Sequence, residues 1–334
     1  MKLTLIDRIG IAFKKAKLNL DNSWFAAIKQ AKNFSSLLSV NSDPKTIKGL
    51  KDGFLTGVQY LAPAKVSGWN VCKFATTCAE VCLYTAGRGA FDKAIPKARI
   101  NRTKFFFEHR NLYFVQLIKE IIQLQIKAAK HELIAAVRLN GMSDLTWERI
   151  KFNGKTIFEI FDIQFYDYTK YPYQDRPNES LPSNYHLTYS YSENTTKEQL
   201  LLNIDNGRNV AAVFNLCEND NKKSCRNKCK CSMIDSYLGI PVIDGDLSDL
   251  RFLDKSGVIV GLRAKGEARE ENDFTIKIQN IKIPHFENIQ STKFIPLQNK
   301  KIVTCRTCNK PTKSQYMFGF TCQRCIDQYA EVSI

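Results

Sequence analysis

The sequence lacks any uninterrupted apolar run of about 18 residues, the length that a membrane-spanning helix needs. It has no internal repeats and no low-complexity tract, so a repeat architecture is not expected. The N-terminus, MKLTLIDRIGIAFKKAKLNL, carries charges within its apolar stretch and has no small-residue cleavage site, which is unlike a signal peptide. We therefore expect a cytoplasmic protein with no membrane partner.

Acidic residues and histidines are few. The chain has 33 Asp and Glu against 49 Lys and Arg, which gives a net charge of +16. A positive field of this size favours polyanionic partners such as nucleic acid, although it says nothing about the fold. The alternative is a basic surface that serves solubility only. The four histidines are scattered, and we predict no ligand or catalytic role for them.

The composition is that of a globular protein, with 334 residues of which 44% are apolar and 25% are charged. Residues 1–50 are basic, and their apolar positions recur every three or four residues, which predicts a helical arm that ends at the turn residues SVNSDPKT. A second helical pattern extends from Phe91 to Lys130. We expect residues 51–295 to form the main domain and residues 296–334 to form a separate tail.

Seven short apolar or β-branched segments within residues 51–295 predict buried parallel strands. The segments are GVQYLAP, LIAAVRLNG, IQFYDYTK, YHLTYSYSE, NVAAVFNL, IPVIDGD and VIVGLRAKG. The later segments are separated by stretches that are short for full helices, which favours an incomplete barrel over an eight-fold one. The predicted fold class is therefore α/β, a partial parallel (β/α) barrel with an N-terminal helical arm and a small C-terminal zinc-ribbon-like tail.

Polar residues gather at the C-terminal ends of five of these strands, at the edge where active sites of parallel barrels collect. They are Arg138, Asn140, Ser143, Asp144, Asp167, Thr169, Lys170, Ser190, Ser192, Glu193, Asp244, Asp246, Arg263 and Lys265. We predict catalytic roles for Asp144, Asp167, Lys170 and Glu193. Cofactor contacts are predicted for Asn140, Ser143, Gly87 and Gly89. The alternative is that strands commonly end in polar residues because loops are solvated.

The eleven cysteines fall into three tight groups, a pattern more typical of metal ligands than of disulfides in an intracellular chain. Cys72, Cys78 and Cys82 form a C-x5-C-x3-C spacing. Three thiolates fit a [4Fe–4S] cluster that keeps one iron open. A helix beginning near Thr77 would place Cys78 and Cys82 one turn apart. The alternatives are a zinc site with a distant fourth ligand and ordinary buried thiols.

The middle group lies in a cysteine-rich insertion at residues 217–231, CENDNKKSCRNKCKC. Its members, Cys217, Cys225, Cys229 and Cys231, would suffice for one zinc ion or one iron–sulfur cluster. The interleaved Lys and Arg residues would lower the thiol pKa values and balance a thiolate site, and they also resemble a surface that faces nucleic acid. The alternative is a solvated basic loop with unligated thiols.

The last group consists of two C-x2-C knuckles separated by thirteen residues. Cys305 and Cys308 form the first knuckle, and Cys322 and Cys325 form the second. Two such knuckles complete a tetrahedral zinc site, with a rubredoxin-like iron site as the minor alternative. Zinc would stabilise a tail too small to bury a core of its own, and the basic residues around the knuckles would suit contact with nucleic acid.

Seven segments over about residues 55–270 form a distinctive ordered series: LAPAKVSGWNVCKFATTCAEVCLYTAGRGA, ARINRT, AVRLNGMSDLTWE, FYDYTK, YHLTYSYSE, PVIDGDLSDLRF and GLRAKGEAR. They resemble segments of the bacteriophage gene product 88 family. The resemblance implies a phage or prophage origin and no particular reaction. The order of elements is also similar to that of radical S-adenosylmethionine enzymes, which place three cysteines after the first strand of a partial parallel barrel. That likeness implies a [4Fe–4S] cluster that binds S-adenosylmethionine, although the usual spacing there is C-x3-C-x2-C.

The leading functional hypothesis is an iron–sulfur enzyme, similar to radical S-adenosylmethionine enzymes, that acts on nucleic acid or a nucleotide. A second hypothesis is a metal-dependent nuclease in which Asp144, Asp167, Glu193, Asp244 and Asp246 hold Mg²⁺ or Mn²⁺. The third is a non-enzymatic nucleic-acid-binding protein whose modules are stapled by zinc. The sequence predicts no oligomeric state.

Overall fold

The computed structural model describes Lys14 and residues 36–41, 44–82, 92–217, 225, 231–270 and 272–277, together with the backbone of four short strands near the C-terminus. The chain divides into two compact units, residues 1–281 and residues 282–334. Within the described residues, no helix is long and apolar enough to cross a membrane.

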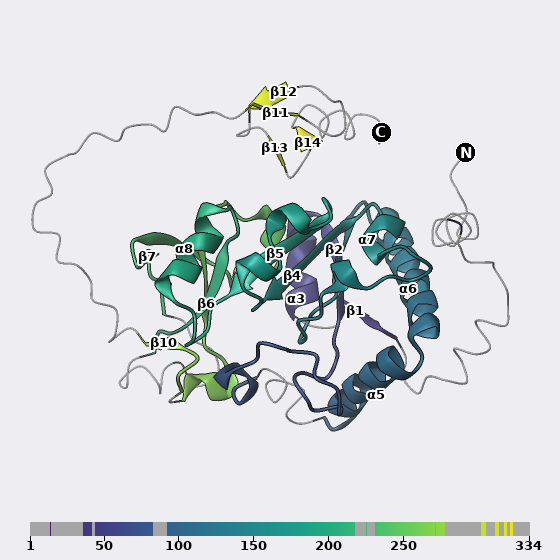
Figure 1. Cartoon of the computed structure of the whole chain (residues 1–334), viewed down its shortest axis with the longest axis horizontal. Helices are drawn as coiled ribbons and strands as arrows, with labels where there is room; N and C mark the ends of the chain where they lie inside the picture. The colour runs from purple at the N-terminus through teal and green to yellow at the C-terminus, as the bar shows by residue number, and fades with distance from the viewer. Residues whose placement is uncertain are drawn as a thin grey trace, which may run out of the picture. The chain divides into compact units, whose positions relative to one another are not determined.

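The first unit is built on a ten-stranded, mostly parallel sheet (Figure 1). All seven predicted strands are present and pair in parallel. They are β2 (Phe54–Gln59), β3 (Ile134–Arg138), β4 (Gln164–Thr169), β5 (Tyr185–Ser190), β6 (Val210–Asn215), β8 (Ile240–Asp244) and β9 (Ile259–Arg263). Their order in space is β2-β3-β4-β5-β6-β9-β8, so the last two strands exchange places relative to the sequence.

Three short strands complete the sheet. β1 (Leu38–Val40) pairs antiparallel with β2, and β7 (Ser236–Tyr237) pairs antiparallel with β8. β10 (Ile276–Lys277) pairs in parallel with β6. Among the described residues β1 and β7 do not pair with each other, so the sheet is open. The architecture is thus mixed α/β, and its curvature into a partial barrel stays a prediction.

Two local predictions about helices are wrong. Leu38 was expected in the helical arm, yet it lies in β1, because pairing with the free edge of β2 overrides the local helical periodicity. Beyond it, α3 (Pro44–Lys48) forms a short helix where turn residues were expected. The long pattern from Phe91 to Lys130 forms two helices, α5 (Ala94–Glu108) and α6 (Arg110–Lys130), which separate where the backbone of His109 turns to φ −131° and ψ 52°.

The main core lies between the helices and one face of the sheet. α6 runs beside β2 and β3 (Figure 1), and its Phe114, Ile118 and Ile121 belong to one buried cluster with Val137 and Phe165 of the strands. α7 (Ile157–Ile160) adds Phe158 to this cluster. Residues 113–118 of α6 are all buried, so this part of the helix is covered on every side, and exposed residues appear only in its first turn and in its last turns.

A second cluster lies around β6, and it holds the other end of the sheet together. α8 (Lys197–Asp205) begins at a capping box formed by Thr196 and Gln199, and it contributes Leu200 to this cluster beside Phe214. The two clusters together fix the positions of the strands in the first unit. The loops that follow those strands therefore start from fixed points.

The second unit contains two antiparallel pairs, β11 (Ile302–Thr304) with β12 (Pro311–Lys313), and β13 (Met317–Phe318) with β14 (Thr321–Cys322). Of the predicted zinc ligands in this tail, Cys322 lies in β14, and Cys305, Cys308 and Cys325 lie outside the described residues. The four-cysteine zinc site therefore stays a prediction.

Candidate functional site

Parallel pairing brings the carboxyl ends of seven strands to one edge of the sheet, hereafter the carboxyl edge. The loop with the first cysteine group (residues 60–82, the cysteine loop) follows β2, and the loop of residues 139–147 follows β3. Lys170 directly follows β4, and Glu193 lies three residues beyond β5. The placement agrees with the general rule that ligands of open α/β sheets bind outside the carboxyl ends of the strands.

Hydrogen bonds join the cysteine loop to the loops of two other strands. The amide of Asp144 donates to the carbonyl of Val71 at 2.8 Å. The Cys72 thiol lies 3.7 Å from the carbonyl of Met142, and it accepts from the amide of Ala64 at 3.4 Å. The amide of Thr77 donates to Glu193 Oε1 at 3.1 Å. The cysteine loop is therefore anchored at the centre of the carboxyl edge, between the ends of β3 and β5.

The thiols of Cys78 and Cys82 act electrostatically on Cys72, but the three sulfur atoms do not converge as ligands of one ion would. Burial, together with the nearby Asp144, Cys82 and Cys78, raises the pKa of Cys72 to about 12, although the hydrogen bond from the Ala64 amide opposes the shift. Within the described ranges, the three sulfur atoms do not all come within 4.8 Å of one another. The predicted helix from Thr77 is wrong for the described residues, because only one 3₁₀ turn, Thr77–Ala79, forms there.

Lys170 sits among the ionisable groups of this edge. Its amide donates to Asp144 Oδ2 at 2.7 Å, and its ammonium donates to the carbonyl oxygens of Ser190 and Tyr191 at 3.4 and 3.2 Å. Burial lowers the pKa of Lys170 below its usual value, whereas nearby acidic groups and thiols oppose this shift. These groups are Cys78, Glu193, Asp144 and Cys72. Such perturbed groups at a sheet edge are typical of functional sites.

Glu193 binds the cysteine loop, and its negative charge acts on Lys170. Burial raises its pKa, but hydrogen bonding by Thr76 and Thr77 outweighs the burial and leaves the pKa below its usual value. The same side chain accepts from the Thr77 amide and raises the pKa of Lys170, so its charge acts on both the cysteine loop and the ammonium group.

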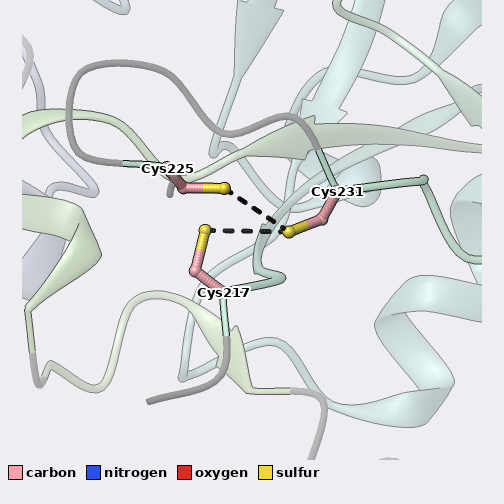
Figure 2. A group of neighbouring side chains, drawn as sticks. All are labelled: Cys217, Cys225 and Cys231. Carbon is pink, nitrogen blue, oxygen red and sulfur yellow. Dashed lines mark hydrogen bonds between the residues drawn. The ribbon is translucent and has the colours of Figure 1, made fainter. Parts of the chain in front are cut away.

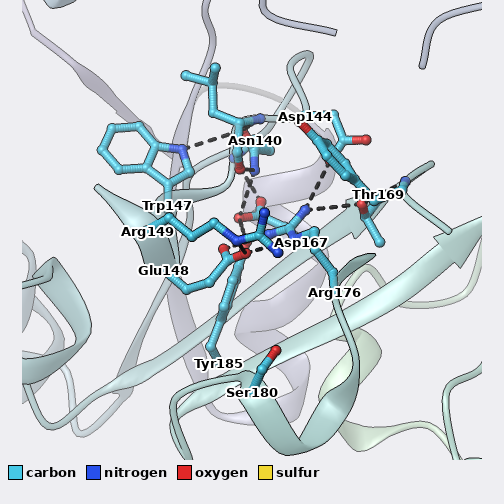
Figure 3. A network of polar contacts seen from close by, with 12 residues as sticks. Asn140, Asp144, Trp147, Glu148, Arg149, Asp167, Thr169, Arg176, Ser180 and Tyr185 are labelled. Carbon is cyan, nitrogen blue, oxygen red and sulfur yellow. Dashed lines mark hydrogen bonds and ion pairs between the residues drawn. The ribbon is translucent and has the colours of Figure 1, made fainter. Parts of the chain in front are cut away.

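Asp144 is held by a buried guanidinium that the sequence analysis missed (Figure 3). Arg176 is fully buried and donates from Nη1 to Asp144 Oδ1 at 3.1 Å. Its Nε and Nη2 donate to the two oxygens of Glu148, both at 2.8 Å. Burial raises the pKa of Asp144 despite the opposing charge of Arg176. We call Arg176, Asp144 and Glu148 the Arg176 cluster.

Three predicted site residues, Asn140, Ser143 and Asp167, make their hydrogen bonds to buried groups of the protein itself. Asp167 is fully buried, and it accepts from the amide of Asn140 at 2.7 Å and from the Tyr185 hydroxyl at 2.9 Å. The side-chain oxygen of Asn140 accepts from the Ser143 hydroxyl at 2.8 Å and from the Trp147 indole at 3.3 Å. Burial raises the pKa of Asp167 to about 7. These side chains shape the loop after β3, and their contact with a ligand stays a prediction.

The middle cysteines do converge on one point (Figure 2). The sulfur of Cys231 lies 4.0 Å from that of Cys217 and 3.8 Å from that of Cys225. All three sulfur atoms lie within 4.8 Å of one another, and among the described residues this is the only such group of three cysteine, histidine or acidic side chains. The three cysteines can therefore hold a metal ion. Cys229 lies outside the described residues.

Basic side chains form ion pairs with the carboxylates at the end of β8 and just beyond it. Arg263 binds Asp244 through two hydrogen bonds of 2.7 and 2.9 Å, and it lies 3.2 Å from Asp246. The Arg263 side chain also donates to the carbonyl of Cys231 at 3.0 Å, which ties this ion pair to the middle cysteines. In the part of the chain that is described, the five carboxylates of the nuclease hypothesis form no group of three within 4.8 Å. The predicted glycine contacts, Gly87 and Gly89, lie outside the described residues.

The profile of the family described as Gene product 88 matches residues 34–280, well over half of the chain. The chain therefore belongs to the gene product 88 family, as its motifs indicated. No curated protein and no solved structure matches it. The similarity to radical S-adenosylmethionine enzymes stays a prediction.

Proposed function

We propose that the chain is a phage metalloenzyme that acts on a nucleic acid or a nucleotide at the carboxyl edge, with a [4Fe–4S] cluster held by Cys72, Cys78 and Cys82. The observation that carries the proposal is the anchoring of the cysteine loop between the ends of β3 and β5. Thiolates that each bind a different iron stand farther apart than thiolates around one ion, which suits sulfur atoms that do not meet at one point.

The protein's own groups have distinct tasks in this proposal. When bound, the cluster supplies an electron, and its open iron offers a place for S-adenosylmethionine or the substrate. Lys170 faces the cysteine loop and the carboxylates, where it can hold an anionic group or a proton. The net charge of +16 attracts a polyanionic substrate.

Anaerobic reconstitution with iron and sulfide is expected to load about four iron atoms per chain and to give the EPR signal of a reduced cluster. Cys72→Ser, Cys78→Ser and Cys82→Ser should each lose most of this iron and signal. Cys217→Ser is the matched control, because it removes a thiol of another group, and it should keep both. Stoichiometric zinc without iron in the wild-type protein, or iron retained by the three variants, would refute the proposal.

We further propose that the middle cysteines bind a single zinc ion rather than a cluster. Thiolates at about 2.3 Å from one zinc ion in a tetrahedron stand about 3.8 Å apart. The separations of 3.8 Å between Cys225 and Cys231 and of 4.0 Å between Cys217 and Cys231 fit this geometry. The burial of Cys225 suits a structural site that closes around its ion. Such an ion would fasten the insertion at residues 217–231 to the end of β6.

Metal analysis of the same anaerobic preparation tests the zinc proposal. With the tail contributing a site of its own, about two zinc ions per chain are expected, and Cys217→Ser or Cys225→Ser should reduce this to about one. Cys78→Ser is the control and should leave the zinc content unchanged. A loss of iron and sulfide instead of zinc in Cys217→Ser would show that the middle group holds a cluster.

A further inference from the structure

Helix α5 carries an exposed row of lysines, Lys93, Lys97 and Lys104, hereafter the basic row. The four- and seven-residue spacings place these side chains on one face of the helix. The only acidic residue within α5 is Glu108, its last residue. Asp92, just before the helix, accepts from the first amide of α5 at 2.9 Å. The exposed face of α5 therefore presents mainly positive charge to solvent.

Helix α5 adjoins the cysteine loop (Figure 1). The amide of Ala62 in that loop donates to the hydroxyl of Thr103 in α5 at 2.9 Å, and Arg99 of α5 lies over the ring of Tyr60 at 5.5 Å. Residues 60–82 and 92–110 together hold eight Lys and Arg against three Asp and Glu, a net charge of +5 in 42 residues. The whole chain carries +16 in 334 residues, so positive charge is concentrated here.

Two stacked aromatic rings lie beside the basic row. Trp69 of the cysteine loop lies flat against Phe107 of α5, with ring centroids 5.3 Å and planes 3° apart. Phe107 is three residues beyond Lys104, so the two are neighbours on the helix surface. Trp69 is partly exposed, and its neighbours Gly68 and Asn70 are exposed, which places the indole at the surface. Surfaces that bind single-stranded nucleic acid combine cations for the phosphates with aromatic rings on which bases stack.

A further cation lies over aromatic rings next to Cys72. Lys73 is exposed, and its ammonium lies 5.1 Å from the ring of Phe74 and 5.8 Å from that of Tyr171. These two rings meet edge to face, with centroids 4.7 Å apart. Tyr171 directly follows Lys170, so this group joins the cysteine loop to the carboxyl edge. Cations and rings therefore continue from the loop to the groups of the proposed active site.

We propose that the basic row and the Trp69–Phe107 pair form a binding surface for a single-stranded nucleic acid beside the cysteine loop. Phosphates would contact Lys97 and Lys104, which are about 10 Å apart along the helix axis. An unpaired base would stack on the face of Trp69 that Phe107 does not cover. A duplex offers no such contact, because its bases stack on one another. The inference names the polymer on which the proposed enzyme acts and therefore rests on the proposed function.

Fluorescence anisotropy of the reconstituted full chain with a labelled oligothymidylate tests the charged part of this surface. The logarithm of the association constant should fall linearly with the logarithm of the salt concentration. Lys97→Gln/Lys104→Gln should reduce this slope by about 1.4, because each phosphate contact on a single strand contributes about 0.7. Lys127→Gln/Lys255→Gln is the matched control. Both of its lysines are exposed and lie near the ends at which β3 and β9 begin, so the slope should not change.

The aromatic part is tested at Trp69 in the same assay. Trp69→Ala should weaken binding of the oligothymidylate at least about fivefold and leave the salt dependence unchanged, because it removes a stacking ring and no charge. Trp69→Phe keeps a ring and should bind within about twofold of the wild type. Heparin, a polyanion without bases, should bind Trp69→Ala as it binds the wild type. Oligouridylate in a parallel titration distinguishes RNA from DNA, and tight binding of either supports the surface.

Iron is counted in the same samples, which separates this inference from the proposed function. The surface is refuted if the double lysine variant keeps the wild-type slope, or if Trp69→Ala binds the oligothymidylate as tightly as the wild type does. Equal weakening of heparin and oligothymidylate binding in Trp69→Ala would also refute it, because heparin has no base to stack. A chain without iron that shows the expected dependences supports the surface and refutes the cluster alone.

Discussion

Replacing Arg176 with alanine is expected to lower the free energy of unfolding by about 3–5 kcal/mol. The guanidinium is fully buried, and it pairs with Asp144 and Glu148, whose side chains are 11% and 5% exposed. Its removal leaves two carboxylates in a region of low dielectric constant without a compensating charge. The midpoint of urea unfolding, followed by circular dichroism, measures the loss.

Arg149→Ala is the matched control for this variant. Arg149 also approaches Glu148, at 3.9 Å, but its side chain is 56% exposed. A solvent-exposed ion pair contributes at most about 1 kcal/mol, so the control should unfold close to the wild type. Equal losses in the two variants would show that burial of the Arg176 cluster does not determine its contribution.

Most strands of the fold were predictable because they are apolar segments largely buried on both faces, as β6 and β9 are. β8 was predictable from its apolar residues, although only Ile240 in it is buried. The order of the strands in space was not predictable in full. β9 lies between β6 and β8. This order depends on packing between segments that are distant in the sequence. The strand at Leu38 was missed for the same reason, because the residue opposite it in the strand pairing, Gln59, is remote in sequence.

The candidate site was predictable where it depends on strand ends. Lys170 and Glu193 lie at the carboxyl edge because they follow parallel strands, and the placement needs no knowledge of side-chain packing. Arg176 was not predictable in this way, since it lies in a polar loop between Pro172 and Pro177 that resembles a solvated turn. The sequence does offer one indication of a buried cation, the two acidic residues in MSDLTWE. If the neighbouring Trp147 is buried, these carboxylates need a positive charge nearby.

The residues that would contact a ligand are therefore positioned by buried residues behind them. Arg176 orients Asp144, whose other oxygen accepts from the amide of Lys170. The amide of Asp144 in turn bonds the cysteine loop at Val71. A change at the loop after β3 should thus affect the cysteine loop even when it touches no cysteine.

Gly141→Ala tests this coupling. A Cβ at Gly141 would lie 2.5 Å from the carbonyl oxygen of Gln59 and 2.7 Å from the Tyr60 ring, closer than atoms can approach. The loop would have to move, and with it the hydrogen bond of 2.9 Å from the Gly141 amide to Gln59. We expect a loss of about 1–3 kcal/mol in the free energy of unfolding, as for other overpacked sites.

The displaced loop should also lower the iron content after reconstitution, because Met142 and Asp144 contact the cysteine loop at Cys72 and Val71. Gly49→Ala is the matched control, since a Cβ there meets its nearest neighbours at 3.4 Å, an ordinary van der Waals contact. It should lose less than about 0.5 kcal/mol and keep its iron. If Gly141→Ala unfolds earlier than the wild type yet binds iron fully, the loop after β3 contributes to stability without positioning the cysteines. Urea unfolding and iron analysis of both variants therefore separate the two roles of this loop.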